Sequence, residues 1–167
     1  MLVRRARTED LPAMRRAFRA AGLAAWPHII PAERLAENEP PPRWTDSLES
    51  SDERTAVLVG ELDAEVVGFA IVRPSGDDDV DPSTVGELDA LYSHPSVWGR
   101  GIGRALLEQA VDFLRSAGFG EATLWTAEEN HRPRRIYERG GWRLDGARRA
   151  RNHLGSDFVE LRYRREL

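Results

Sequence analysis

Eight residues from Val97 to Arg104, Val-Trp-Gly-Arg-Gly-Ile-Gly-Arg, decide how the rest of this chain is interpreted. Glycine occupies every second position from 99 to 103, and a strand-like run precedes the loop. A helix is expected from about 101 to 117, because apolar side chains recur there at helical spacing. A strand, a glycine loop and a helix N-terminus together form a phosphate cradle, since glycine permits close approach and the first amides of a helix lack partners.

Two common phosphate-binding motifs do not fit this loop. The dinucleotide motif G-x-G-x-x-G needs a third glycine, but counting from Gly99 that position is Arg104, and counting from Gly101 it is Leu106. The P-loop needs a lysine before serine or threonine, and the chain contains no lysine. The loop therefore predicts a different phosphate site, one that relies on backbone N–H groups.

Composition limits the class of protein. The chain has 167 residues, 41% apolar and 31% charged, which predicts one domain over residues 1–167. The absence of cysteine excludes disulfides, thiolate metal sites and a cysteine nucleophile. No apolar run or leader-like segment indicates membrane insertion or secretion, so we expect a cytoplasmic protein. The net charge of −4 argues against a nucleic-acid partner, and the four histidines lack metal-ligand spacing, so no metal is expected.

Periodicity and turn residues predict a mixed α/β chain whose first half is mainly antiparallel. The acidic run 77–81 is expected to be a solvated loop, and the arginine-rich segment 148–153 a loop between two final strands. Gly22 is expected to end the first helix, which begins near Thr8. The expected strands are 2–6, 54–62, 65–73, 85–93, 122–127, 142–147 and 158–164, and the main expected helices are 8–22, 101–117 and 130–139.

Two segments have features that a plain strand or linker would not show. Glu87 and Asp89 alternate with Leu88 and Ala90, but Leu91 and Tyr92 are adjacent and both apolar, which indicates a β-bulge at that point. The proline-rich segment 24–51 contains Trp26 and His28 and is too aromatic for a linker. It either plugs the core or forms a lid over an acceptor site.

Three motifs resemble those of the GNAT superfamily of N-acetyltransferases. Residues Trp98 to Gly103 are similar to its acetyl-CoA loop, [QR]-x-x-G-x-[GA], with tryptophan in place of the usual glutamine or arginine. Residues 87–95 look like its fourth strand, and residues 129–142 look like its later E-N-x-x-A-x-x-x-Y-E-x-x-G-[FW] block. The resemblance implies an α/β (α+β) fold: a mixed, mostly antiparallel twisted sheet of about seven strands, with helices on both faces and a splay between strands four and five.

The resemblance also implies acetyl-CoA as the acyl donor and assigns residues to it. The pantetheine arm would meet the backbone of Leu91 and Tyr92, and Asn130 would lie near the thioester. The pyrophosphate would meet the loop formed by Trp98, Gly99, Arg100, Gly101, Ile102, Gly103 and Arg104.

The reaction, attack of an amine on a thioester, needs a group that removes a proton and a group that supplies one. The resemblance favours Glu87 as general base, directly or through a water, and Tyr137 as general acid toward the departing thiolate. Asp89, on the same nominal face, is the alternative base, and Glu87 could equally be an ordinary charged strand residue. Without cysteine, direct transfer in a ternary complex is expected.

The acceptor is the least defined part of the prediction. It would be a primary amine on a small molecule or a peptide, contacted by Trp26, His28 and Asp89. The family resemblance also allows a homodimer. The alternative function is a non-catalytic module that binds acyl-CoA as a sensor.

Overall fold

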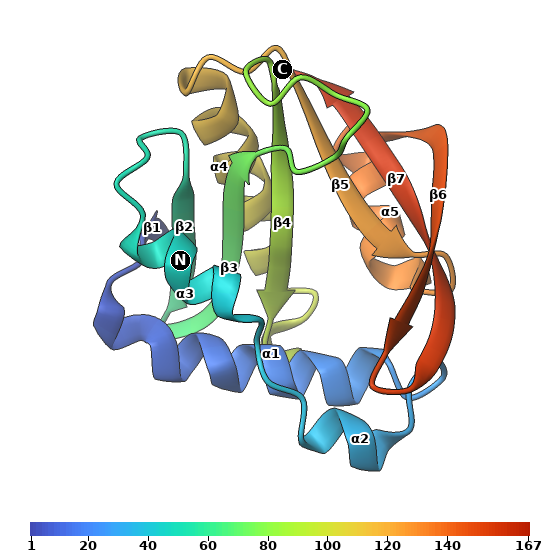
Figure 1. Ribbon diagram of the computed structural model, residues 1–167. Helices are drawn as coiled ribbons and strands as arrows, with labels where there is room; N and C mark the ends of the chain where they lie inside the picture. Colours follow the sequence, from blue (N-terminus) through green and yellow to red (C-terminus); the bar gives the residue numbers. More distant parts are fainter.

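The computed structural model describes residues 1–167 and arranges seven strands in the order β1-β2-β3-β4-β5-β7-β6 (Figure 1). The strands are β1 (Leu2–Arg5), β2 (Ala56–Leu62), β3 (Glu65–Pro74), β4 (Val85–Ser93), β5 (Glu121–Ala127), β6 (Arg143–His153) and β7 (Ser156–Glu166). The α-helices are α1 (Leu11–Ala25), α2 (Ala32–Ala36), α3 (Pro42–Glu49), α4 (Ile102–Ser116) and α5 (His131–Arg139), and short 3₁₀ turns lie at Thr8–Asp10 and Pro95–Val97. No helix in this set is both long and apolar enough to cross a membrane.

The sheet divides between β4 and β5, as predicted. Strands β1 to β4 pair antiparallel, whereas β4 and β5 pair parallel and only from Val85 to Glu87 on the β4 side. Beyond Glu87 the two strands diverge, and the gap between them is visible in Figure 1. The last residues of β4 therefore have a free edge.

Helices cover both faces of the sheet and create two apolar cores. Helix α4 packs on one face through Leu106 and Leu114, both fully buried. Gly86 of β4 permits this approach, because a Cβ there would lie 2.6 Å from a methyl carbon of Leu114. Helices α1 and α3 cover the other face, where Phe18 and Trp44 pack against β2, β3 and β4. The predicted fold class is confirmed.

The β-bulge in β4 lies at Asp89, not at Leu91 and Tyr92 as predicted. Ile71 of β3 pairs with Ala90, and its neighbour Val72 pairs with Leu88, so Asp89 is the extra residue. Leu91 and Tyr92 pair in regular register. The broken alternation of apolar and polar residues did indicate a bulge, because an inserted residue moves each later side chain of the strand to the opposite face of the sheet.

Three further expectations were wrong. Gly22 lies inside α1, which continues to Ala25, since a helical glycine costs only about 1 kcal/mol relative to alanine. The segment 148–153 is part of β6 and pairs with β7, from Arg148 with Leu161 to His153 with Ser156. The acidic loop is not simply solvated, because Asp77 and Asp79 bind the buried Arg162 of β7 at 3.2 and 2.6 Å.

Candidate active site

The open edge of β4 presents backbone groups to the gap beside β5. His94 N–H donates to the Val67 carbonyl at 2.7 Å, and opposite residues in an antiparallel ladder alternate between bonded and non-bonded pairs. His94 is a bonded position, so Tyr92, two residues earlier, is also hydrogen-bonded to β3. Leu91 lies between bonded positions, and its N–H and C=O therefore point away from β3, toward the gap. An extended ligand could therefore pair with Leu91 as an added strand would.

Two cavities meet at this gap. The larger, about 680 Å³, extends from Leu91 along the glycine loop and α5. The smaller, about 330 Å³, lies over the other face of β4 and under the β6–β7 hairpin. The residues that line both are Trp26, Leu91, Tyr92, Asn130, Pro133 and Tyr137. A ligand in one cavity can therefore reach a ligand in the other at this junction.

The glycine loop fits a diphosphate group. Gly99 and Gly101 have φ values of +84° and +89°, which other residues adopt only with strain. The first hydrogen bond entering α4 runs from Ala105 N–H to the Gly101 carbonyl, so the amides just before Ala105 have no helical partner. These amides belong to Ile102, Gly103 and Arg104, and all three residues line the larger cavity. Free N–H groups at a helix N-terminus favour an anion.

Trp98, the departure from the usual motif, has a defined structural role. Its indole N–H donates to the Ser93 carbonyl at 3.0 Å, and its ring lies under the Arg132 guanidinium at 4.2 Å from the ring centroid. Trp98 therefore fixes the end of β4 against α5. Arg100 does not line either cavity, and its exposed guanidinium lies 3.9 Å from the Asp63 carboxylate, so its contact with the pyrophosphate stays a prediction.

Tyr137 and Asn130 place unpaired polar groups at the junction of the two cavities. Both residues are buried, at 6% and 7% exposure, and their side chains make no hydrogen bond within the protein. Burial raises the pKa of Tyr137 above its ordinary value, and the neighbouring Tyr92 and Tyr163 add to this. The phenol is therefore protonated at neutral pH and available as a donor.

Glu87 and Asp89 lie on the same face of β4, as predicted, but their surroundings differ. Arg73 Nη2 donates to Glu87 Oε2 at 3.4 Å and to Asp89 Oδ1 at 3.1 Å. Asp89 also accepts from the Trp44 indole at 2.9 Å and from Arg43 at 3.3 Å. Glu87 has only one other donor, the Gly76 N–H at 3.3 Å.

The pKa of the Glu87 carboxyl is raised above its ordinary value. Burial is the main cause, and repulsion from the Asp89 carboxylate is the next, against the opposing attraction of Arg73. A carboxyl with a raised pKa holds a proton more readily than an ordinary glutamate. It is thus better suited to receive one.

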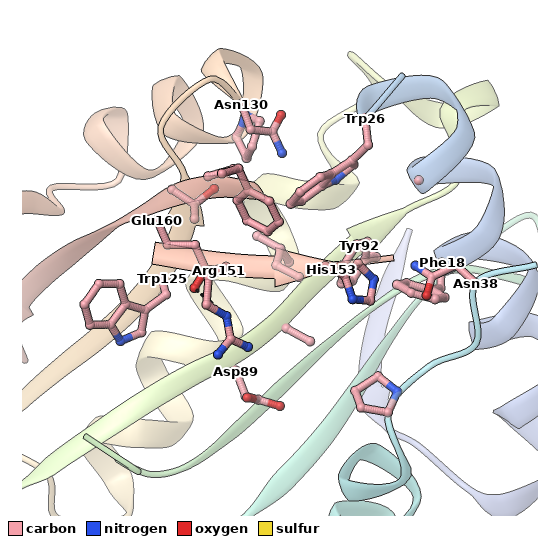
Figure 2. A pocket seen from close by; sticks show the side chains of 18 of the residues that line it. Phe18, Trp26, Asn38, Asp89, Tyr92, Trp125, Asn130, Arg151, His153 and Glu160 are labelled. Atoms are coloured by element: carbon pink, nitrogen blue, oxygen red, sulfur yellow. Dashed lines mark ion pairs between the residues drawn. The ribbon is translucent and has the colours of Figure 1, made fainter. Parts of the chain in front are cut away.

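The smaller cavity is roofed by contacts between the α1–α2 segment and the β6–β7 hairpin (Figure 2). The Trp26 ring meets Phe158 edge-on with centroids 5.5 Å apart, and Arg34 donates to the Leu154 carbonyl at 3.0 Å. His28 donates from Nε2 to the Glu129 carbonyl at 3.1 Å and lies outside both cavities. Of the predicted acceptor contacts, Trp26 and Asp89 line the cavity, whereas His28 braces its roof.

Three hairpin residues that were not predicted to belong to the site also line it: Arg149, Arg151 and Glu160. These side chains line the smaller cavity because they alternate on one face of the β6–β7 pair. His153 lines it too, and burial and the nearby Arg151 charge lower the pKa of its imidazole. The available signal was the spacing of two between Arg149, Arg151 and His153, which is the period of a strand.

Comparisons with known proteins find sequence similarity to acetyltransferases. A model of the acetyltransferase (GNAT) family matches residues 13–142. An uncharacterized N-acetyltransferase of Mycobacterium bovis is 29% identical over 153 residues, 87% of this chain and 92% of the relative. A second uncharacterized N-acetyltransferase, from Archaeoglobus fulgidus, is 33% identical over 87 residues, and this match spans only 59% of that relative and 52% of this chain.

The fold is also similar to that of a solved structure. The PaiA N-acetyltransferase of Thermoplasma acidophilum, in complex with coenzyme A, superposes with a TM-score of 0.76 at 19% identity. The match covers 99% of this chain and 98% of the other. At this identity the likeness concerns the fold, including the splayed sheet that forms the two cavities.

Proposed function

This chain belongs to the acetyltransferase (GNAT) family, and on that premise we propose that it moves an acetyl group from acetyl-CoA to a primary amine in one direct step. The observation that carries the proposal is the junction of the two cavities at Tyr137, a buried phenol with no partner in the protein. The larger cavity would take the donor and the smaller one the acceptor.

The residues of the larger cavity match the parts of acetyl-CoA. The free amides of Ile102, Gly103 and Arg104 would hold the pyrophosphate, and the Leu91 backbone would pair with the pantetheine amides. The Asn130 side chain, unpaired and at the junction, would orient the end that reacts. Acetyl-CoA supplies the acetyl group as an activated thioester.

Glu87 is the group that would deprotonate the acceptor. An alkylammonium ion has no lone pair for attack, so its proton must pass to a base, directly or through a water. The raised pKa and few donors of Glu87 suit this role. Asp89 is occupied by Arg43, Trp44 and Arg73, and we assign it to shaping the cavity instead.

Tyr137 would complete the proton balance. As the amine nitrogen bonds to the acetyl carbon and the carbon–sulfur bond breaks, the phenol gives its proton to the sulfur. The products are an N-acetylated amine and the free thiol of coenzyme A. The nitrogen loses its second proton as it becomes an amide, and this proton restores the phenol through a water, while Glu87 releases the first proton to solvent before the next turnover.

Thermal unfolding with and without acetyl-CoA tests the binding half of this proposal. A ligand at about 100 times its Kd adds roughly 2.7 kcal/mol, which for a domain near this size raises Tm by roughly 5–10 °C. NAD and ATP serve as controls, since the loop fits neither of their common motifs. No shift at millimolar acetyl-CoA would overturn the proposal, and binding without thiol release for any amine would point to a non-catalytic acyl-CoA sensor.

A further inference from the structure

One cation in the acceptor cavity lacks a carboxylate of its own. The Arg151 guanidinium is half exposed, and its nearest carboxylate oxygen, Glu160 Oε2, is 3.6 Å away. That same oxygen accepts from Arg149 Nε at 2.6 Å. Arg151 makes no hydrogen bond to it, and Figure 2 shows its side chain reaching from the hairpin into the cavity between Trp125 and Asp89.

The other charged groups around the cavity are paired. Asp89 accepts from Arg43, Trp44 and Arg73, as described above. Glu39 pairs with Arg19. Two groups have only long contacts to opposite charges: the Arg151 guanidinium, 3.6 Å from Glu160, and the Glu87 carboxyl, 3.4 Å from Arg73.

The cavity is of a size and lining that suit a small molecule. Its volume of about 330 Å³ is at the lower end of the range for small-molecule sites. Aromatic rings of Trp26, Tyr92, Trp125 and Phe158 form much of its wall. The Trp26–Phe158 and Arg34–Leu154 contacts roof it at the hairpin end, which leaves less room there for a polypeptide.

We propose that the acceptor is a free α-amino acid with an apolar or aromatic side chain, and that Arg151 binds its carboxylate. The amine then lies toward Glu87, and the side chain rests against the aromatic wall. A guanidinium is suited to this task because it can donate two parallel hydrogen bonds to a carboxylate. The inference rests on the proposed function and deepens it by naming the substrate class.

The same observations disfavour two other acceptor classes. A polyamine needs unpaired carboxylates along the cavity to receive its further ammonium groups, and Asp89, Glu160 and Glu39 are already paired. The N-terminus of a protein carries its next backbone group as an amide, which offers Arg151 no negative charge. An acceptor with its own anion would give Arg151 the carboxylate that Glu160 already shares with Arg149.

The experiment compares acetylation of the standard L-amino acids with that of the corresponding amines that lack the carboxylate. L-Phenylalanine with 2-phenylethylamine and L-leucine with 3-methylbutylamine are the most informative pairs, and release of coenzyme A thiol is the readout. We expect kcat/KM to favour the amino acid by roughly 10- to 150-fold, the value of a hydrogen bond to a charged group. Arg151→Gln should remove that preference, by lowering kcat/KM for the amino acid far more than for the plain amine.

Arg148→Gln is the matched control. Arg148 lies three residues before Arg151 on β6, pairs with Glu128 at 2.8 Å and does not line the cavity, so its loss should leave the preference intact. Arg151→Lys should retain part of the preference, because a point charge remains without the bidentate geometry. Calorimetric titration of L-phenylalanine into the protein with coenzyme A gives a second readout that does not depend on turnover.

The outcomes separate the inference from the function on which it rests. Equal or better acetylation of the plain amines, or an unchanged preference in Arg151→Gln, overturns the inference while the proposed function stands. Binding of acetyl-CoA with neither binding nor acetylation of any amino acid also overturns it. Failure to bind acetyl-CoA at all overturns the proposed function itself.

Discussion

Two neighbouring tyrosines allow a sharp test of the proton donor. The rings of Tyr137 and Tyr163 have centroids 6.1 Å apart, and both are buried. The Tyr137 hydroxyl has no partner in the protein, whereas the Tyr163 hydroxyl accepts from Arg134 at 3.0 Å and donates to Glu138 at 2.7 Å. The same tyrosine-to-phenylalanine change should therefore affect chemistry at one position and stability at the other.

Removal of the Tyr137 hydroxyl leaves no buried group unpaired, so Tyr137→Phe should change the free energy of unfolding by less than about 1 kcal/mol. It removes the proposed acid, and we expect kcat to fall by roughly 10²- to 10⁴-fold, the range for a positioned proton donor. Tyr163→Phe leaves Arg134 and Glu138 without that partner and should cost about 1–3 kcal/mol, or roughly 2–12 °C in Tm.

Thermal unfolding and steady-state thiol release on the two variants measure both effects. Acetyl-CoA binding should survive in Tyr137→Phe, since the hydroxyl is proposed to act on the sulfur as the carbon–sulfur bond breaks and not when the cofactor binds. A kcat within tenfold of the parent in Tyr137→Phe, or an equal loss in Tyr163→Phe, would refute the assignment of Tyr137 as the acid.

Three further predictions follow from single residues. Glu87→Gln should lower kcat/KM by roughly 10²- to 10⁴-fold and remove an acidic limb that lies above the ordinary glutamate pKa. The folded-state pKa of Glu87 is raised, so ionisation of this carboxyl lowers the stability of the parent protein as pH rises. Glu87→Gln should therefore be more stable than the parent at pH 7. This advantage should disappear below about pH 4, where Glu87 is protonated in both the folded and the unfolded parent, and urea unfolding at the two pH values measures it. Gly101→Ala should lower the free energy of unfolding by about 1–2 kcal/mol, because φ is +89° there, and should weaken acetyl-CoA binding. Gly22→Ala lies inside α1 with open space around it and should raise the free energy of unfolding by up to about 1 kcal/mol. Equal Tm values for the two variants would contradict this prediction. Arg162→Gln should cost about 3–5 kcal/mol, because Asp77 and Asp145 lose their buried partner, and a Tm unchanged at neutral pH would show that the network is not stabilising.

The features that depend on local pattern could be predicted from the sequence. The bounds of β4 match the expected strand 85–93, and α4 starts within one residue of the prediction, because glycine, apolar spacing and turn residues act over a few positions. Glu87 and Tyr137 required the family resemblance, since a buried carboxyl and a buried phenol look like any other strand acid and helix aromatic.

The β6–β7 hairpin shows why part of the site could not be predicted. Hydropathy identifies a strand by alternating apolar and polar residues, or by a short continuous apolar run where both faces are buried. In β6 the outward Arg148 and the inward Arg149 and Arg151 are all charged, because the inward face borders a cavity and not the core. A strand that lines a polar site therefore has the hydropathy of a loop. The residues of this site that matter most for function lie where the hydropathy pattern is weakest.

The choice between Glu87 and Asp89 depends on contacts that no local pattern contains. The two carboxyls share a face, a strand and the Arg73 guanidinium. What distinguishes them is α3, which brings the Trp44 indole to Asp89 across 45 positions of sequence and leaves Glu87 without it. A carboxylate that accepts several hydrogen bonds is stabilised in its charged form and is a poor proton acceptor, whereas one held mainly by burial is primed to take a proton. In the proposed mechanism the proline-rich segment would thus decide which carboxylate is the base, because its side chains bond to Asp89 and leave Glu87 with fewer donors.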